Sequence, residues 1–112
     1  MQISTRQSGT FTIVDVVGDI DLYNSPEIRK VLLENIRDKK VPRIIINLKE
    51  VRYIDSSGVA SLIEAFQKAR KAGRKFVLAA VSESALRVLN LARMDKVFAI
   101  CPSVAEGLAQ VR

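Results

Sequence analysis

The chain has 112 residues, with 18 Lys plus Arg against 12 Asp plus Glu, a formal net charge of +6, no His and a single Cys. Its length and its 48% of hydrophobic residues are typical of one folded domain rather than of a disordered chain. Without His and with one Cys, a Ser-His-Asp triad, a histidine or cysteine metal site and an internal disulfide are excluded.

The first third of the chain predicts two strands and a helix. Residues 3–6 and 11–17 are the predicted strands, and the second is rich in β-branched residues and stops at Gly18. Residues 19–24 form a loop. Ser25 is the expected N-cap of a helix that has Pro26 at its first position, and this helix ends at residues 38–40.

Three consecutive isoleucines within residues 43–48 predict a strand that is buried on both faces, as in the middle of a covered sheet. A loop follows over residues 49–55. Apolar residues at helical spacing then predict a second helix over residues 57–72, with Gly73 as its C-terminal cap.

The last third predicts another buried strand at 75–81, a helix capped by Ser82, a short strand at 97–100 and a final helix. Ser103 and Glu106 match a capping box for that final helix, whose apolar residues are Val104, Leu108 and Val111. Strands that alternate with helices predict an α/β fold with a mixed, mostly parallel sheet of four or five strands. The first two strands are expected to form an antiparallel hairpin, and four helices to pack against the sheet, in one domain over residues 1–112.

Basic residues are concentrated in residues 68–75, which hold Lys68, Arg70, Lys71, Arg74 and Lys75 and no acid. They surround a predicted helix end, where cations complement the helix dipole without any partner. Contact with a nucleic acid or an acidic partner is the alternative. We favour the solvated helix end and predict no nucleic-acid binding, because no aromatic residue is interleaved for base stacking.

The first residues contain no apolar core of a signal peptide, and the longest apolar run, residues 76–81, is too short to span a bilayer. We therefore expect a cytoplasmic protein that does not insert into membranes.

The loop between the buried strand and the second helix is the main candidate site. Asp55 or Ser56 can cap the helix, which puts Ser57 in its first turn. A phosphate on Ser57 would add about −1.5 to −2 charge. The positive helix end favours that charge and the neighbouring Asp55 opposes it. The simpler alternative is that Asp55, Ser56 and Ser57 only cap the helix.

Other chemistry is not supported by the residue spacings. Neither Ser56 nor Ser57 has Gly two positions before it, and the five glycines form no phosphate-binding loop, so a phosphate must come from another protein. Asp19 and Asp21 alone are weak evidence for a cation-binding site, so we predict neither metal nor cofactor. Cys101 is interpreted as a buried, inert thiol, and Tyr23 as either contact surface or local packing.

Two stretches resemble a known family. Residues 17–26 read Val-Gly-Asp-Ile-Asp-Leu-Tyr-Asn-Ser-Pro, and residues 53–59 read Tyr-Ile-Asp-Ser-Ser-Gly-Val between the buried strand and the amphipathic helix. Together with residues 82–97 they resemble the STAS domain proteins, specifically the single-domain bacterial anti-sigma factor antagonists.

This resemblance implies a partner switch. In that family the unphosphorylated protein binds an anti-sigma factor that is also a serine kinase, and so frees the sigma factor. Phosphorylation dissociates the complex and a phosphatase, of the PP2C type, resets it. The resemblance implies that Ser57 is the phosphorylated serine and that the partner-binding residues are Asp19, Asp21, Tyr23, Asn24, Ser25, Asp55, Ser56 and Gly58. It also implies a monomer or weak dimer.

Three hypotheses result from the sequence. The first is a phosphorylation-controlled antagonist of an anti-sigma kinase, which we prefer because Ser57 keeps the acceptor hydroxyl. The second is a constitutive STAS interaction module of a transport or sensory complex, in which the motif is only structural. The third is a small enzyme, which the missing His and missing motifs argue against.

Overall fold

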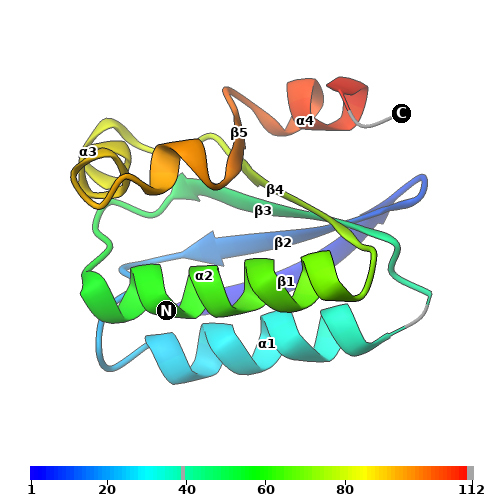
Figure 1. Ribbon diagram of the computed structural model, residues 1–112, viewed down its shortest axis with the longest axis horizontal. Coiled ribbons are helices and arrows are strands. Elements are labelled where there is room, and N and C mark those ends of the chain that lie inside the picture. Colours follow the sequence, from blue (N-terminus) through cyan, green and yellow to red (C-terminus); the bar gives the residue numbers. More distant parts are fainter. Residues whose placement is uncertain (39, 111–112) are drawn as a thin grey trace.

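The computed structural model describes residues 1–38 and 40–110, which form a five-stranded sheet with helices on both faces (Figure 1). The strands lie side by side in chain order: β1 (Gln2–Ser8), β2 (Phe11–Val17), β3 (Arg43–Glu50), β4 (Lys75–Ala79) and β5 (Ala99–Cys101). β1 and β2 form an antiparallel hairpin, and β2 to β5 are parallel. The predicted mixed, mostly parallel sheet is therefore confirmed.

The helices divide between the two faces of the sheet. α1 (Ser25–Arg37) and α2 (Ser56–Lys71) lie next to each other against one face, and α4 (Val104–Gln110) lies on the opposite face (Figure 1). α3 (Glu83–Leu91) and the short 3-10 helix η1 (Met94–Lys96) sit beyond one end of the strands. The four predicted helices are thus all present.

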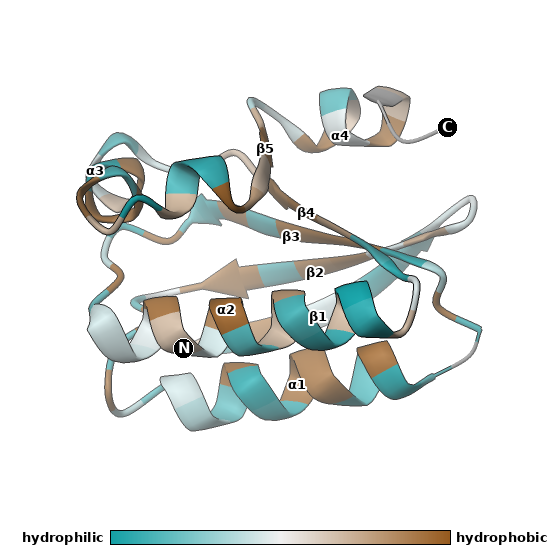
Figure 2. Cartoon of the chain, viewed as in Figure 1, coloured by the Kyte–Doolittle hydropathy of each residue, from teal (hydrophilic) through white to brown (hydrophobic). Residues whose placement is uncertain are grey.

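The hydrophobic core consists of two clusters, one on each side of the sheet, because β3 is buried on both faces. Ile44 and Ile46 point into the larger cluster beneath α1 and α2, whereas Ile45 points into a smaller cluster. This alternation is the two-residue period of a strand. Val104 and Leu108 of α4 cover the smaller cluster. Figure 2 shows β3 and β4 as largely hydrophobic. Ile44, Ile45 and Ile46 are all buried, as predicted from the run of three isoleucines.

Some predicted boundaries were wrong. Asn24, not Ser25, is the N-cap of α1, because Asp21 supplies the acceptors for the turn before the helix: its backbone oxygen accepts from the Ser25 amide at 2.7 Å. β4 ends at Ala79, since Ala80 leaves the extended conformation with φ 56°. The last strand begins at Ala99 rather than at residue 97, because the amides of residues 97 and 98 both donate to Met94.

Other local predictions were confirmed. Gly73 follows the end of α2 with φ 72°, a left-handed conformation that glycine adopts at no steric cost. The Ser103 hydroxyl accepts a hydrogen bond from the Glu106 amide at 3.1 Å, as the predicted cap requires. Residue 39, within the predicted end of the first helix, and Val111, predicted in the final helix, lie outside the described residues.

Candidate functional site

Two loops that follow parallel strands are joined at one end of the sheet. Residues 19–24 follow β2, and residues 51–55 follow β3. Ile20 donates its amide to the Tyr53 carbonyl at 2.9 Å and accepts from the Asp55 amide at 3.1 Å, which forms an isolated parallel bridge between Ile20 and Ile54. The loops thus continue the strand pairing beyond the sheet, at the carboxyl ends of the strands where α/β proteins place their sites.

Asp55 holds these two loops and α2 together. One carboxylate oxygen, Oδ1, accepts from the Gly58 amide at 3.0 Å and so caps the first turn of α2. The other, Oδ2, accepts from the Leu22 amide at 3.0 Å, across 33 positions of sequence. Of the two predicted caps, Asp55 and Ser56, the structure selects Asp55, and Ser56 is the first helical residue.

The loop before α1 has its own internal bonds. Asp21 Oδ1 accepts from the amides of Tyr23 and Asn24 at 3.1 and 3.0 Å. The Asn24 side chain donates Nδ2 to the Asp19 carbonyl at 3.1 Å. These are the local side-chain bonds by which Asp and Asn stabilise turns. The carboxylate of Asp21 therefore shapes the loop.

Gly58 lies directly beneath this loop and is buried. A Cβ atom at this position would overlap the Ile20 carbonyl oxygen and lie only 2.7 Å from Ile20 Cγ2. Only glycine therefore permits the close approach of the loop to the start of α2.

Ser57 occupies the first turn of α2 and is half-buried, while Ser56 beside it is exposed. The Ser57 hydroxyl makes no hydrogen bond to any residue that the structure describes. It lies at the positive end of the α2 dipole, within reach of solvent. A phosphoryl group could replace the hydroxyl proton of Ser57 without disrupting a hydrogen bond to any described residue.

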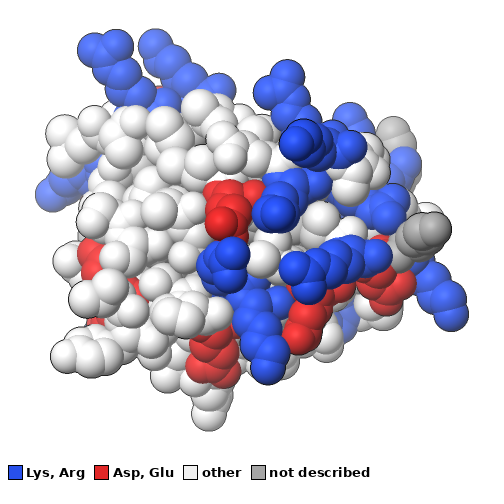
Figure 3. Space-filling model, turned by 60° about the horizontal axis from the view of Figure 1, so that its bottom comes forward, with Lys and Arg blue, Asp and Glu red and all other residues white. Residues whose placement is uncertain are grey.

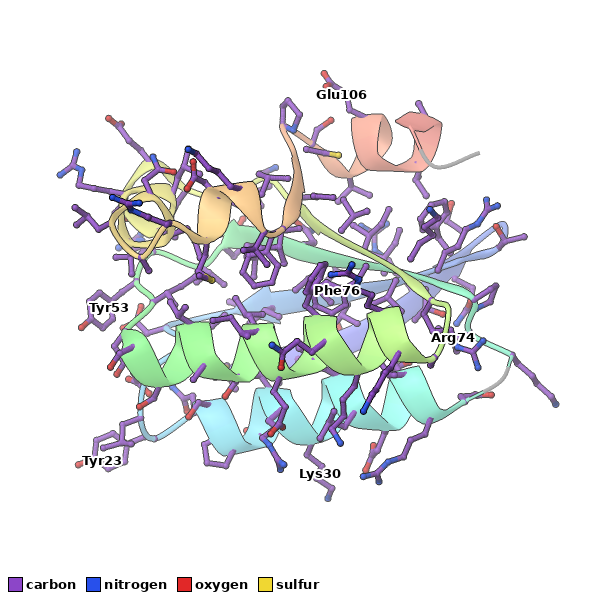
Figure 4. All side chains as sticks on the ribbon, in the orientation of Figure 1. Tyr23, Lys30, Tyr53, Arg74, Phe76 and Glu106 are labelled. Atoms are coloured by element: carbon purple, nitrogen blue, oxygen red, sulfur yellow. The ribbon has the colours of Figure 1, made fainter. Side chains whose placement is uncertain are left out.

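Exposed apolar side chains surround the site. Tyr23, Leu22 and Tyr53 are 90%, 67% and 52% exposed. Tyr23 and Tyr53 both project from the end of the molecule where α1 and α2 begin (Figure 4). The exposure of Tyr23 excludes local packing as its role. The sequence analysis did not single out Leu22 and Tyr53 as site residues. The available signal was that each is an apolar or aromatic residue in a loop, outside the periodic pattern of any helix or strand.

The predicted site residues thus come together in two loops and at the starts of α1 and α2. Asp19, Tyr23 and Ser56 are exposed there, whereas Asp21, Asn24, Asp55 and Ser57 are half-buried. Ser25 and Gly58 are buried, so they can shape the surface but cannot present side chains on it.

The rest of the described chain adds no second chemical centre. It contains no cluster of three or more His, Cys, Asp or Glu residues that could hold a metal ion. Cys101 is buried, as expected, and burial together with the nearby Glu106 raises the pKa of its thiol, which disfavours the reactive thiolate. No helix in the described ranges combines the length and the apolar character needed to cross a bilayer.

Comparisons with known proteins agree with this geometry. The sequence model of the STAS domain matches residues 2–107. The anti-sigma-B factor antagonist of Bacillus subtilis is 26% identical over 108 residues, covering 96% of this chain and 97% of the relative. The crystal structure of an anti-sigma factor antagonist from Mycobacterium paratuberculosis has a TM-score of 0.90 at 24% identity, over 99% of this chain and 93% of that one.

A second similar structure is that of the Bacillus cell fate determinant SpoIIAA in its phosphorylated form. Its TM-score is 0.76 at 18% identity, over 99% of this chain and 100% of that one. At this level of identity the likeness concerns the fold.

Proposed function

The chain belongs to the STAS domain family, and from this membership we propose that it is an anti-sigma factor antagonist controlled by phosphorylation. In this proposal the unphosphorylated chain binds an anti-sigma factor that is a serine kinase, in the cytoplasm, and releases the sigma factor. Phosphorylation of Ser57 ends the binding, and a PP2C-type phosphatase restores it. The chain itself is a binding protein and not an enzyme.

The observation that carries the proposal is the environment of the Ser57 hydroxyl. It is half-buried, forms no hydrogen bond within the described residues and stands in the first turn of a capped helix. The chain offers an acceptor oxygen and no nucleotide-binding loop of its own. Support also comes from a relative of nearly equal length that is named an antagonist, and from a neighbour of the same fold whose phosphorylated form has been solved.

The chemistry of transfer explains why phosphate would end the binding. A kinase must bring the terminal phosphate of its nucleotide to the Ser57 oxygen. After transfer, about −1.5 to −2 charge stands on Ser57, next to the remaining nucleotide phosphates and close to Asp55. Like charges held at contact distance in a water-poor interface repel each other strongly. The product complex is therefore less stable than the substrate complex.

The surface around Ser57 fits a protein partner. Tyr23, Leu22 and Tyr53 are exposed aromatic and aliphatic side chains, the kind that anchor protein interfaces. Asp19 and Ser56 add polar contacts at the rim. Asp21, Asn24, Ser25, Asp55 and Gly58 contribute by holding this surface in shape.

A constitutive STAS interaction module is the second candidate. The observation that favours it is that two residues of the motif already have structural roles. Asp55 caps α2 and bonds the loop at Leu22, and Gly58 permits the close packing of this loop against α2. In that case Ser57 would not be modified and binding would not depend on ATP.

Intact-mass measurement after incubation with ATP and candidate anti-sigma serine kinases separates the two. We expect a gain of one phosphoryl group in the natural chain and in Ser56→Ala, and none in Ser57→Ala. A kinase that binds the chain but never labels it would support the constitutive module. Labelling that persists in Ser57→Ala would show that another residue is the acceptor.

A further inference from the structure

A concentration of positive charge lies at the end of the molecule opposite Ser57. Six cations line three adjoining hollows around the C-terminal ends of α1 and α2, and together we call them the basic end: Arg37, Lys68, Arg70, Lys71, Arg74 and Lys75. These six are a third of the eighteen basic residues of the chain, whose formal net charge is +6. Figure 3 shows blue side chains gathered over this end, at the right of the view.

These charges are not neutralised within the described part of the chain. None of the six is in an ion pair there; the pairs join Arg6 to Asp15, Arg29 to Glu64 and Arg87 to Glu83. Glu64 is the one acid that lines the hollows, and its carboxylate is already bonded to Arg29. Like charges within about 8 Å of each other repel at physiological salt.

The helix dipole explains only part of this arrangement. Lys68, Arg70 and Lys71 belong to the last turn of α2, where cations are favoured. Arg37 ends α1, and Arg74 and Lys75 lie at the start of β4, so they converge on the same place from other elements. The dipole of α2 alone therefore does not account for the positions of Arg37, Arg74 and Lys75.

One hollow has an apolar floor and an unsatisfied donor. It has a volume of about 330 Å³ and is lined by Phe66, Phe76 and Gly73 with Arg70, Arg74 and Lys75. The Nε atom of Arg74 is buried and donates to no acceptor in the described residues. A buried guanidinium gains most from a carboxylate, whose two oxygens can accept from the Nε–H and from an N–H of one Nη at once.

We propose that the basic end is a second docking surface, distinct from the Ser57 site, for an acidic protein segment that carries an apolar side chain. Its carboxylates would pair with the six cations, one of them with Arg74, and the apolar side chain would rest on the half-buried Phe66. Figure 4 places Arg74 at the end of the molecule away from Tyr23 and Tyr53, so both surfaces can be occupied together.

The same features argue against two other polyanions. A single-stranded nucleic acid would be expected to stack its bases on exposed rings. Here the rings of Phe66 and Phe76 pack edge-to-face against each other at 6.0 Å, and Phe76 is only 5% exposed. An anionic bilayer is flat and would touch the tips of the cations without filling the hollow. Among the residues that the structure describes, no large hydrophobic one at this end is exposed for insertion.

The test is a titration of the full ¹⁵N-labelled chain, followed by the shifts of its backbone amide signals. The probes are a glutamate-rich synthetic peptide with a central leucine, the same peptide with glutamine for glutamate, duplex DNA and phosphatidylserine vesicles. We expect the acidic peptide to shift the signals of residues 66–76 and Arg37, and the glutamine peptide to shift none. Raising the salt concentration should weaken the binding.

Variants define the contact. Arg74→Gln removes a charge-assisted contact and should weaken peptide binding about tenfold, and Lys71→Glu should do the same. Lys30→Glu, which makes the same change of charge on the exposed part of α1, should leave binding within about twofold, because it lies outside the basic end. Peptide shifts that are absent, or that centre on residues 19–25, would overturn the proposal. Stronger shifts of the same signals with DNA or vesicles would overturn the choice of partner.

Discussion

At the scale of single residues, Asp55 has the widest structural influence on the site. Its two oxygens bond separate segments, the start of α2 at Gly58 and the loop at Leu22. The bond to Gly58 could be predicted from the sequence because capping is local. The bond to Leu22 could not, because it depends on the sheet bringing the two loops together.

Ser57→Asp places a permanent negative charge where the phosphate would stand. We expect it to weaken binding to the anti-sigma kinase by about tenfold or more, and to leave the thermal melt unchanged, because the charge stays outside the core. Titration calorimetry measures the affinity, with Ser57→Asn as the uncharged control. Equal affinity of the aspartate and asparagine variants would show that charge is not the cause.

Gly58→Ala tests the close approach of the loop to α2. The added Cβ meets the Ile20 carbonyl, so we expect a loss of about 1–3 kcal/mol of unfolding free energy, as for other overpacked sites. Urea denaturation measures the change. Ser56→Ala, in the same turn but exposed, should stay within about 0.5 kcal/mol. An unchanged midpoint for Gly58→Ala would mean that the loop can move away at no cost.

Asp15 gives the sheet a dependence on acid pH. Burial alone would raise the pKa of its carboxyl, but hydrogen bonds from Arg6 and Asn47, both at 2.7 Å, and the Arg6 charge hold the pKa below its ordinary value. The network joins β1, β2 and β3.

A lowered pKa means that the folded state binds the proton less readily than the unfolded state. The stability from Asp15 is therefore complete above the ordinary pKa of about 3.9 and is lost as the pH falls below it. We expect Asp15→Asn to be less stable than the natural chain at neutral pH, with the difference shrinking in acid. Urea midpoints measured across this range check the sign, and a difference that grows in acid would contradict it.

At the scale of elements, β3 organises the molecule, because both of its faces are buried. Ile45→Asp would put an unpaired charge into the smaller cluster under α4. Such burial costs several kcal/mol, so we expect the domain to unfold or to melt at a much lower temperature. The same substitution at the exposed Thr5 of β1 is the control, and circular dichroism follows both. A normal melt for Ile45→Asp would contradict the central position of β3.

The sequence predicted the type and order of the elements, because strand and helix periods are strong over β3, α1 and α2. The prediction failed where contacts between distant parts of the chain set a helix boundary or the exposure of a side chain, and where an element was too short to show a period. The start of α1 shifted because Asp21 closes the preceding turn, and η1 was missed because three residues around Met94 give no period to detect. The apolar rim at Leu22 and Tyr53 was missed because exposure is known only once the loops are placed.

At the scale of the whole molecule, the positive charges of the basic end repel one another in the folded state. We expect added sodium chloride to raise the melting temperature by screening this repulsion. Lys71→Gln should raise the melting temperature at low salt and reduce the effect of salt, whereas Lys30→Gln should change little. Scanning calorimetry at several salt concentrations measures both. Identical salt dependence in the two variants would show that the repulsion is spread over the surface.

The order of the strands has a consequence for the growing polypeptide. Each strand pairs with the one synthesised just before it, so the sheet can be extended edge by edge as the chain leaves the ribosome. The helix that shields Ile45 and Val77, however, is α4, which emerges after all the other described elements. Until then the nascent sheet exposes an apolar face to solvent, and a release of the chain before residue 104 would leave an aggregation-prone product.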